Sequence, residues 1–283
     1  MGHVVLAALC VAGFAILFRY FERYNVPLLP AIAINYSVAF LCGLLVAPPW
    51  QAPDVEPLLL PASLLGSLFV LIFSLTGLSA QRAGAARTTI AGRMSLVLTI
   101  AGAVLLFNER LSAWSVMGII LALAGLVLSS MPQADAGTSA RSSYLPFVIF
   151  LCSGIADISV TYVQRVFTNE ANASTFPTLC FGASALVSMA LLFIRGEQPA
   201  LRHARAWVGG VVLGVVNYAS LLFLVWALGA GTYPASIVFP AMNILAIIVA
   251  TGAGLLLFKE RLHLRQWSGI AMCVVALILF MAW

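Results

Sequence analysis

The chain has 283 residues, of which 63% are hydrophobic and 8% are charged, and its mean hydropathy is +1.08. A soluble domain carries about a quarter charged residues, so this composition excludes an ordinary soluble protein and predicts a membrane protein. The net charge of +5 does not indicate nucleic-acid binding, because the basic residues do not cluster with aromatic residues.

Ten apolar segments, each of a length that lets a helix cross a bilayer, follow one another along the chain. The first five are residues 3–20, 29–47, 58–79, 85–107 and 113–131. The last five are residues 144–164, 175–194, 206–228, 234–258 and 266–282. Residues 132–143, PQADAGTSARSS, are polar and rich in small residues, which predicts a linker between the two sets.

The two sets of segments are related in sequence. FNERLSAWSVMGIILALAGLVL (residues 107–128) aligns without a gap with FKERLHLRQWSGIAMCVVALIL (residues 258–279), and residues 9–23 align more weakly with residues 151–165. Because each set has an odd number of spans, the second enters the membrane in the opposite sense from the first. Inverted repeats are typical of transporters, whose two halves exchange conformations around a central site.

Several of these features resemble the drug/metabolite transporter superfamily, and specifically its ten-helix EamA-type members. They are the motif Phe-x-Glu-Arg-Leu at residues 107–111 and 258–262, the following helices with Gly118 and Gly269, and Pro240 in the ninth span. The resemblance extends over essentially the whole chain. It implies an all-α polytopic membrane protein with ten transmembrane helices, arranged as two inverted five-helix repeats around a central cavity. The repeats would be residues 1–131 and 144–283, joined by the linker 132–143.

The resemblance also implies a cavity lined mainly by spans 1, 3, 4, 6, 8 and 9. Members of the superfamily move amino acids, nucleosides, sugar-linked metabolites, quaternary amines or drugs.

Two charged residues lie deep in the apolar segments. Arg93 lies about nine residues into the fourth segment, where inserting an arginine costs about 3 kcal/mol, and Asp157 lies at a comparable depth in the sixth. We expect the two to face each other across the cavity and to bind a zwitterionic or anionic metabolite. The alternative is an internal salt bridge that locks two helices and contributes little net stability.

Other polar or helix-breaking residues on the sixth, eighth and ninth spans are expected to line the same substrate site: Ser153, Thr161, Asn217, Tyr218, Pro240 and Asn243. Proline removes a backbone donor, which leaves a carbonyl able to point into the cavity. The alternative for the small and amide side chains is helix packing, because such residues allow close approach and hydrogen-bond across helix interfaces. Asn35, on a span that the resemblance places at the periphery, is expected to be structural.

Glu109 and Glu260 occupy equivalent positions, at the turns before the fifth and tenth segments. A carboxylate at such a turn can accept backbone N–H groups at the start of the next helix. We therefore expect both to be structural caps paired with neighbouring arginines.

The sequence contains no nucleotide-binding loop or recognisable hydrolase motif, and its histidines and cysteines are not spaced for a metal site. It therefore predicts no enzyme, no metal and no cofactor. The leading interpretation is a secondary transporter that moves a small polar metabolite by alternating access, and Asp157 suggests protons as a coupling partner. The alternatives are a flippase for a lipid-linked sugar or polyprenyl phosphate, with Arg93 meeting the phosphate, and a membrane scaffold that transports nothing.

The basic residues predict an orientation in the cell (inner) membrane. If both termini were cytoplasmic, the cytoplasmic loops would hold Arg110 and Arg165 while most other basic residues lay outside, against the positive-inside bias. We therefore expect a multi-pass protein with both termini outside the cytoplasm, surrounded by the lipid bilayer and acting on a small-molecule substrate.

Overall fold

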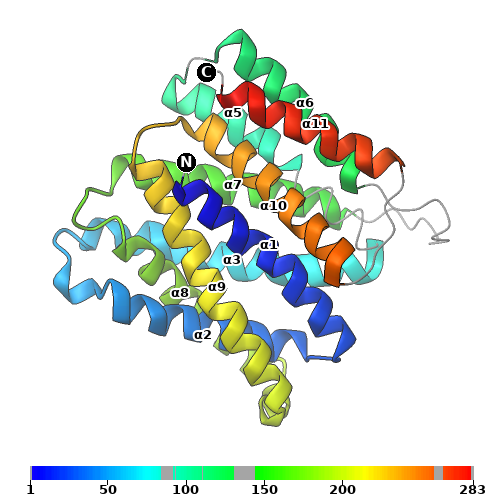
Figure 1. Cartoon of the computed structure of the whole chain (residues 1–283). Coiled ribbons are helices and arrows are strands. Elements are labelled where there is room, and N and C mark those ends of the chain that lie inside the picture. Colours follow the sequence, from blue (N-terminus) through cyan, green and yellow to red (C-terminus); the bar gives the residue numbers. More distant parts are fainter. Residues whose placement is uncertain are drawn as a thin grey trace. The chain divides into compact units, whose positions relative to one another are not determined.

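The structure is a computed structural model, and it describes residues 2–83, 92, 94–109, 111–130, 144–257 and 264–281. These residues form ten α-helices and two short 3-10 helices (Figure 1). The first half contains α1 (Gly2–Arg23), α2 (Leu28–Val46), η1 (Pro49–Gln51), α3 (Glu56–Ala83), α5 (Leu96–Phe107) and α6 (Ala113–Ser130). The second half contains α7 (Leu145–Val166), α8 (Thr175–Ile194), η2 (Gln198–Arg202), α9 (Ala204–Gly229), α10 (Ala235–Leu257) and α11 (Leu264–Met281).

The helices confirm the expected all-helical membrane architecture. In the part of the chain that the structure describes, six helical stretches are long and apolar enough to span a membrane, and shorter apolar helices accompany them. The expected segments agree with the helices to within four residues at each end, except for the fourth. The first part of that segment lies among residues outside the described ranges, and α5 forms its second part.

The helices divide into two compact units, and each unit is built from both halves of the sequence. The first unit comprises residues 1–70 and 159–231, and the second comprises residues 71–158 and 232–283. Helices α1, α2, α8 and α9 therefore belong to the first unit, and α5, α6, α10 and α11 belong to the second. Both α3 and α7 contribute one part to each unit.

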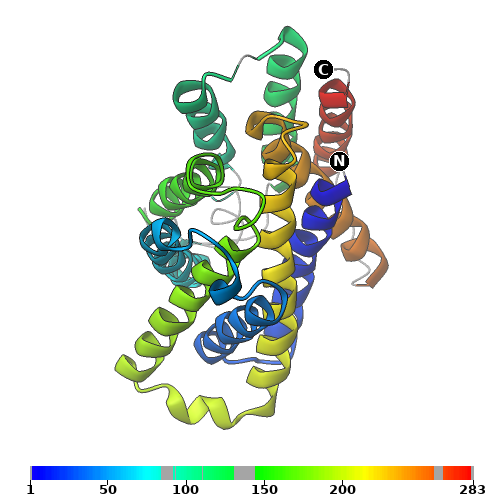
Figure 2. The same ribbon diagram turned by 90° about the vertical axis from the view of Figure 1, so that its left-hand side faces the viewer.

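In the first unit, α9 packs along α2 and α1, and α2 also packs against α8 (Figure 2). Glycines on α9 allow the approach to α2. A Cβ atom added at Gly210 would lie 2.9 Å from the carbonyl oxygen of Ala31, and one added at Gly214 would lie 2.6 Å from that of Asn35. These glycines hence serve close helix packing, as expected for small residues in membrane helices.

In the second unit, α6 packs along α11, and α10 packs against α5, α6 and α11. Gly125 of α6 sits so close to α11 that an added Cβ would lie 2.7 Å from the carbonyl oxygen of Gly269. The pairs α2 with α8, α5 with α10, and α6 with α11 are equivalent helices of the two sequence halves. Three pairs of counterparts therefore pack directly against each other.

Candidate functional site

Asp157 lies on α7 in the second unit and is partly buried. Its Oδ2 atom accepts a hydrogen bond of 3.2 Å from the hydroxyl of Thr99, a buried residue of α5. The same hydroxyl lies 3.3 Å from the carbonyl oxygen of Ser95, one turn earlier in the chain. The sequence singled out the carboxylate of Asp157 but missed Thr99, although Thr99 follows Arg93 by six residues in the same apolar segment.

Two glycines let α5 and α7 meet at this point. A Cβ atom added at Gly154 would lie 2.7 Å from the Cβ of Leu98, and one added at Gly102 would lie 2.7 Å from the Cδ1 of Ile158. The backbones of the two helices are thus close enough for a short hydroxyl side chain to reach the carboxylate. This arrangement places an ionisable carboxyl group, hydrogen-bonded at one oxygen, inside a membrane-spanning helix, which usually marks a functional position.

Asn217 and Tyr218 lie on α9 in the first unit. The Nδ2 of Asn217 donates a hydrogen bond of 3.1 Å to the Oδ1 of Asn35 on α2, and both residues are buried. The ring of Tyr218 packs at 6.3 Å against that of Phe181. Asn35 and Asn217 thus share an interhelical hydrogen bond, and the structural role expected for Asn35 stays a prediction.

The remaining substrate-site candidates are distributed over both units. Asn243 of α10 donates from Nδ2 to the carbonyl oxygen of Phe239, one turn earlier in its own helix, at 3.0 Å, and Pro240 is buried within that helix. Asn243, Pro240 and Ser153 belong to the second unit with Asp157, whereas the buried Thr161 belongs to the first with Asn217 and Tyr218. Arg93 and Glu260 lie outside the described residues, so the pairing of Arg93 with Asp157 stays a prediction.

Glu109 is a helix cap, but it caps a different helix from the one expected. Its two carboxylate oxygens accept the backbone N–H groups of Ala235 and Ser236, at 3.1 and 3.0 Å, in the first turn of α10. The following helix, α6, is instead capped by Ser112, whose Oγ accepts the N–H of Ser115 at 3.1 Å. The two hydrogen bonds of Glu109 thus go to α10 rather than to the next helix, where the nearer Ser112 accepts an N–H group, and the expected pairing of Glu109 with arginines stays a prediction.

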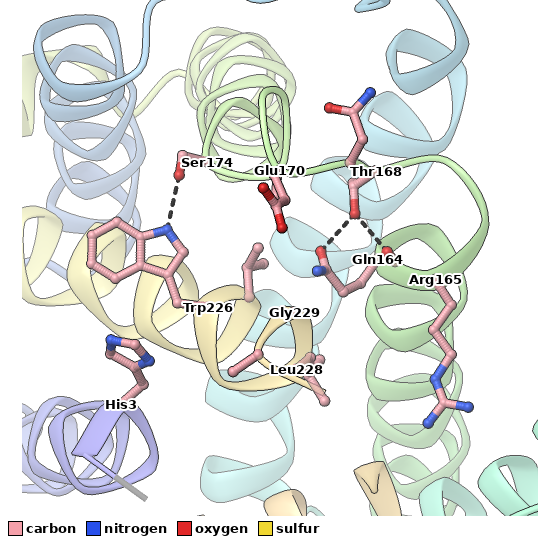
Figure 3. A pocket seen from close by; sticks show the side chains of 13 residues that line it. His3, Gln164, Arg165, Thr168, Glu170, Ser174, Trp226, Leu228 and Gly229 are labelled. Atoms are coloured by element: carbon pink, nitrogen blue, oxygen red, sulfur yellow. Dashed lines mark hydrogen bonds between the residues drawn. The ribbon is translucent and has the colours of Figure 1, made fainter. Parts of the chain in front are cut away.

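A pocket of about 550 Å³ opens in the first unit, where α1 begins and α7 and α9 end (Figure 3). The side chains most relevant to its chemistry are those of His3, Gln164, Arg165, Glu170, Ser174 and Trp226. Sequence analysis did not identify this pocket. The sequence feature that could have pointed to it is the polar loop of residues 167–174, together with Trp226 near the end of the eighth span.

Among the residues that the structure describes, no group of three or more His, Cys, Asp or Glu side chains is placed to hold a metal ion.

Comparisons with known proteins extend over the whole chain. The profile of the EamA-like transporter family matches residues 2–131 and again residues 145–282. An uncharacterized protein of Haemophilus influenzae (strain ATCC 51907 / DSM 11121 / KW20 / Rd) is 28% identical over 289 residues, which cover 98% of this chain and 96% of that protein. A solved crystal structure of a protein shares 17% identity and a TM-score of 0.78, covering 98% of this chain and 94% of its own.

At 17% identity the crystal structure shows a shared fold alone. The family profile goes further, because its two matches account for nearly every residue in both halves of the sequence. Because both halves match its profile and form apolar helices, the chain belongs to the EamA-like transporter family.

Proposed function

We propose that this membrane protein is a secondary transporter of a small polar metabolite, zwitterionic or anionic, which it moves by alternating access. Asp157 and Thr99 would form part of the substrate site. The observation that carries the proposal is the hydrogen bond between these side chains, at 3.2 Å, within apolar membrane helices. A carboxylate in such a place is costly, and membrane proteins usually keep one where it binds cargo or a proton.

The chemistry of the two side chains suggests their roles. A carboxylate attracts the ammonium group of a zwitterion, and a threonine hydroxyl that donates to one carboxylate oxygen holds that carboxylate in a fixed orientation. Arg93, which the sequence places in the same span as Thr99, would supply the complementary positive charge for a carboxylate or other anionic group. Energy would come from a gradient, since the sequence has no nucleotide-binding motif.

The test starts with the purified protein, whose thermal unfolding is measured in the presence of each member of a metabolite collection. A metabolite that binds the folded state raises the midpoint temperature of unfolding. Uptake of each stabilising metabolite is then measured in proteoliposomes for the wild type and for Asp157→Asn. A hydrogen bond to a charged group is worth about 1.5 to 3 kcal/mol, so we expect uptake to fall about tenfold or more.

Thr99→Val and Thr99→Ser form the matched pair for this experiment. Valine removes the hydroxyl but keeps the shape, so it should slow uptake, whereas serine keeps the hydroxyl and should retain most activity. Uptake that is unchanged in Asp157→Asn, in rate and in dependence on pH, would contradict the proposal.

A further inference from the structure

We propose that the pocket at the end of the first unit is a second binding site, which takes a small zwitterion with an apolar body. All residues that line the pocket belong to the first unit, and Asp157 and Thr99 belong to the second. The assignment does not depend on transport, because it concerns binding by residues outside the proposed substrate site.

The buried amide of Gln164 gives the pocket a directed hydrogen-bond donor. Gln164 is 8% exposed, and its Oε1 accepts the hydroxyl of Thr168 at 2.8 Å. Its Nε2 faces the last turn of α9, where a Cβ added at Gly229 would lie 2.6 Å from that nitrogen (Figure 3). None of the hydrogen bonds found among the described residues uses this Nε2 as a donor. This donor suits a ligand that carries an acceptor, such as a carboxylate oxygen.

Two side chains of opposite charge line the same pocket. Arg165 follows Gln164 on α7, and Glu170 comes from the loop between α7 and α8. Glu170 makes no hydrogen bond or ion pair with any residue in the described ranges. The guanidinium of Arg165 points away from Gln164 and Glu170 (Figure 3), so a carboxylate on the ligand would meet the amide of Gln164 and an ammonium group would meet Glu170.

The indole of Trp226 gives the pocket an aromatic surface that is held in one orientation. The indole N–H of Trp226 donates to the Oγ of Ser174 at 2.8 Å, and the ring of His3 packs edge-on at 5.6 Å. These contacts hold the indole in one orientation and occupy its only polar atom. The exposed part of the ring favours an apolar group, and its face also attracts a nearby ammonium.

The loop that carries Glu170 is held in place before any ligand binds. The Oδ1 of Asn169 accepts the N–H groups of Ala171 and Asn172, both at 3.0 Å, and the Oδ1 of Asn172 accepts the N–H of Asn169 at 2.8 Å. Binding therefore costs little loop ordering, which favours affinity. The volume of about 550 Å³ also lies within the range of small-molecule sites, about 300 to 1,000 Å³.

Binding to the purified full-length protein tests the assignment. The probes are alanine, valine, leucine and phenylalanine as free amino acids, together with leucinamide, which lacks the carboxylate, and 4-methylpentanoate, which lacks the ammonium. We expect at least one free amino acid to bind by calorimetry. If leucine binds, both of its analogues should bind about tenfold more weakly or worse.

Variants assign the binding to this pocket. Glu170→Gln and Gly229→Ala should each weaken binding about tenfold, because the first removes the partner of the ammonium and the second pushes against the amide of Gln164. Glu197→Gln is the matched control and should bind normally. It changes a carboxylate in the turn before η2, which precedes α9, and the pocket lies at the opposite end of that 26-residue helix, about 39 Å along it.

Asp157→Asn should also leave this binding unchanged, even where it abolishes uptake. The proposal is overturned if none of the four amino acids binds, or if binding survives both Glu170→Gln and Gly229→Ala. It is equally overturned if Asp157→Asn removes the binding, because the ligand would then occupy the proposed transport site. A failure of the transport proposal alone would show as normal uptake by Asp157→Asn, whatever the pocket binds.

Discussion

Glu109 joins the two sequence halves through a single side chain. The preceding residue, Asn108, ends α5 in the left-handed conformation with φ of 51°. The chain turns at this residue, and the carboxylate of Glu109 then reaches the first turn of α10. Asparagine is one of the few residues that adopt this conformation readily. The carboxylate then satisfies two N–H groups at the N-terminus of α10, where the helix dipole also favours a negative charge.

Replacing Glu109 by alanine should therefore destabilise the protein by about 1 to 2 kcal/mol, as loss of a helix cap does. Glu109→Gln should cost less, because one acceptor oxygen remains. Thermal unfolding of the detergent-purified variants, followed by tryptophan fluorescence, measures the difference. Glu197→Ala serves as a control on an interhelical turn, and an equal midpoint for Glu109→Ala and wild type would show that the cap is dispensable.

Sequence reasoning identified Asp157 and Glu109 but not the groups that hydrogen-bond to them, which are the hydroxyl of Thr99 and the first N–H groups of α10. A charged residue in an apolar segment stands out on composition alone, so its importance is visible before the fold is known. Thr99 and the N-terminus of α10 become partners only when helices distant in the chain are packed together. For Asn217 the same limit applied, because its engagement with Asn35 depends on how closely α9 approaches α2.

The crossing of α5 and α7 depends on two helices that each present a glycine to the other. The hydroxyl of Thr99 can reach Asp157 only if the backbones stay this close, so the crossing and the hydrogen bond are coupled. The Cβ of Leu98, which faces Gly154, is fixed by its backbone and cannot rotate away.

Gly154→Ala should hence strain the crossing and lower stability by about 1 to 3 kcal/mol, the usual cost of overpacking. Gly252→Ala on α10 is the control, because nothing lies within 4 Å of a Cβ added there. That control should match or exceed the wild type, since alanine favours helix more than glycine does. Thermal midpoints measure both variants, and equal midpoints for the two would show that α5 and α7 are not tightly packed.

At the scale of the whole molecule, apolar length and turn residues were enough to predict the helices, because each span must satisfy its own backbone hydrogen bonds in lipid. The sequence repeat also predicted two related halves, which the family matches at residues 2–131 and 145–282 bear out. It did not reveal that each compact unit mixes both halves. Which helices pair is decided by close contacts at glycines such as Gly125 and Gly214, and these contacts leave no trace in hydropathy.

The orientation predicted from the basic residues can be tested in a bacterial host. Alkaline phosphatase fused after Trp283 should be active and green fluorescent protein at the same position should be dark, because the C-terminus would lie outside the cytoplasm. The same reporters fused within residues 132–143 should give the opposite pattern. A fluorescent C-terminal fusion with an inactive phosphatase would reverse the assignment.

The mixed composition of the two units also constrains synthesis. Asn35 is made 182 residues before its hydrogen-bond partner Asn217. At about 5 to 20 residues per second, a ribosome needs about 10 to 35 s to bridge that interval. During this time the Oδ1 of Asn35 lacks its donor on α9, so the packing of α2 against α9 can be completed only after α9 has been synthesised and inserted.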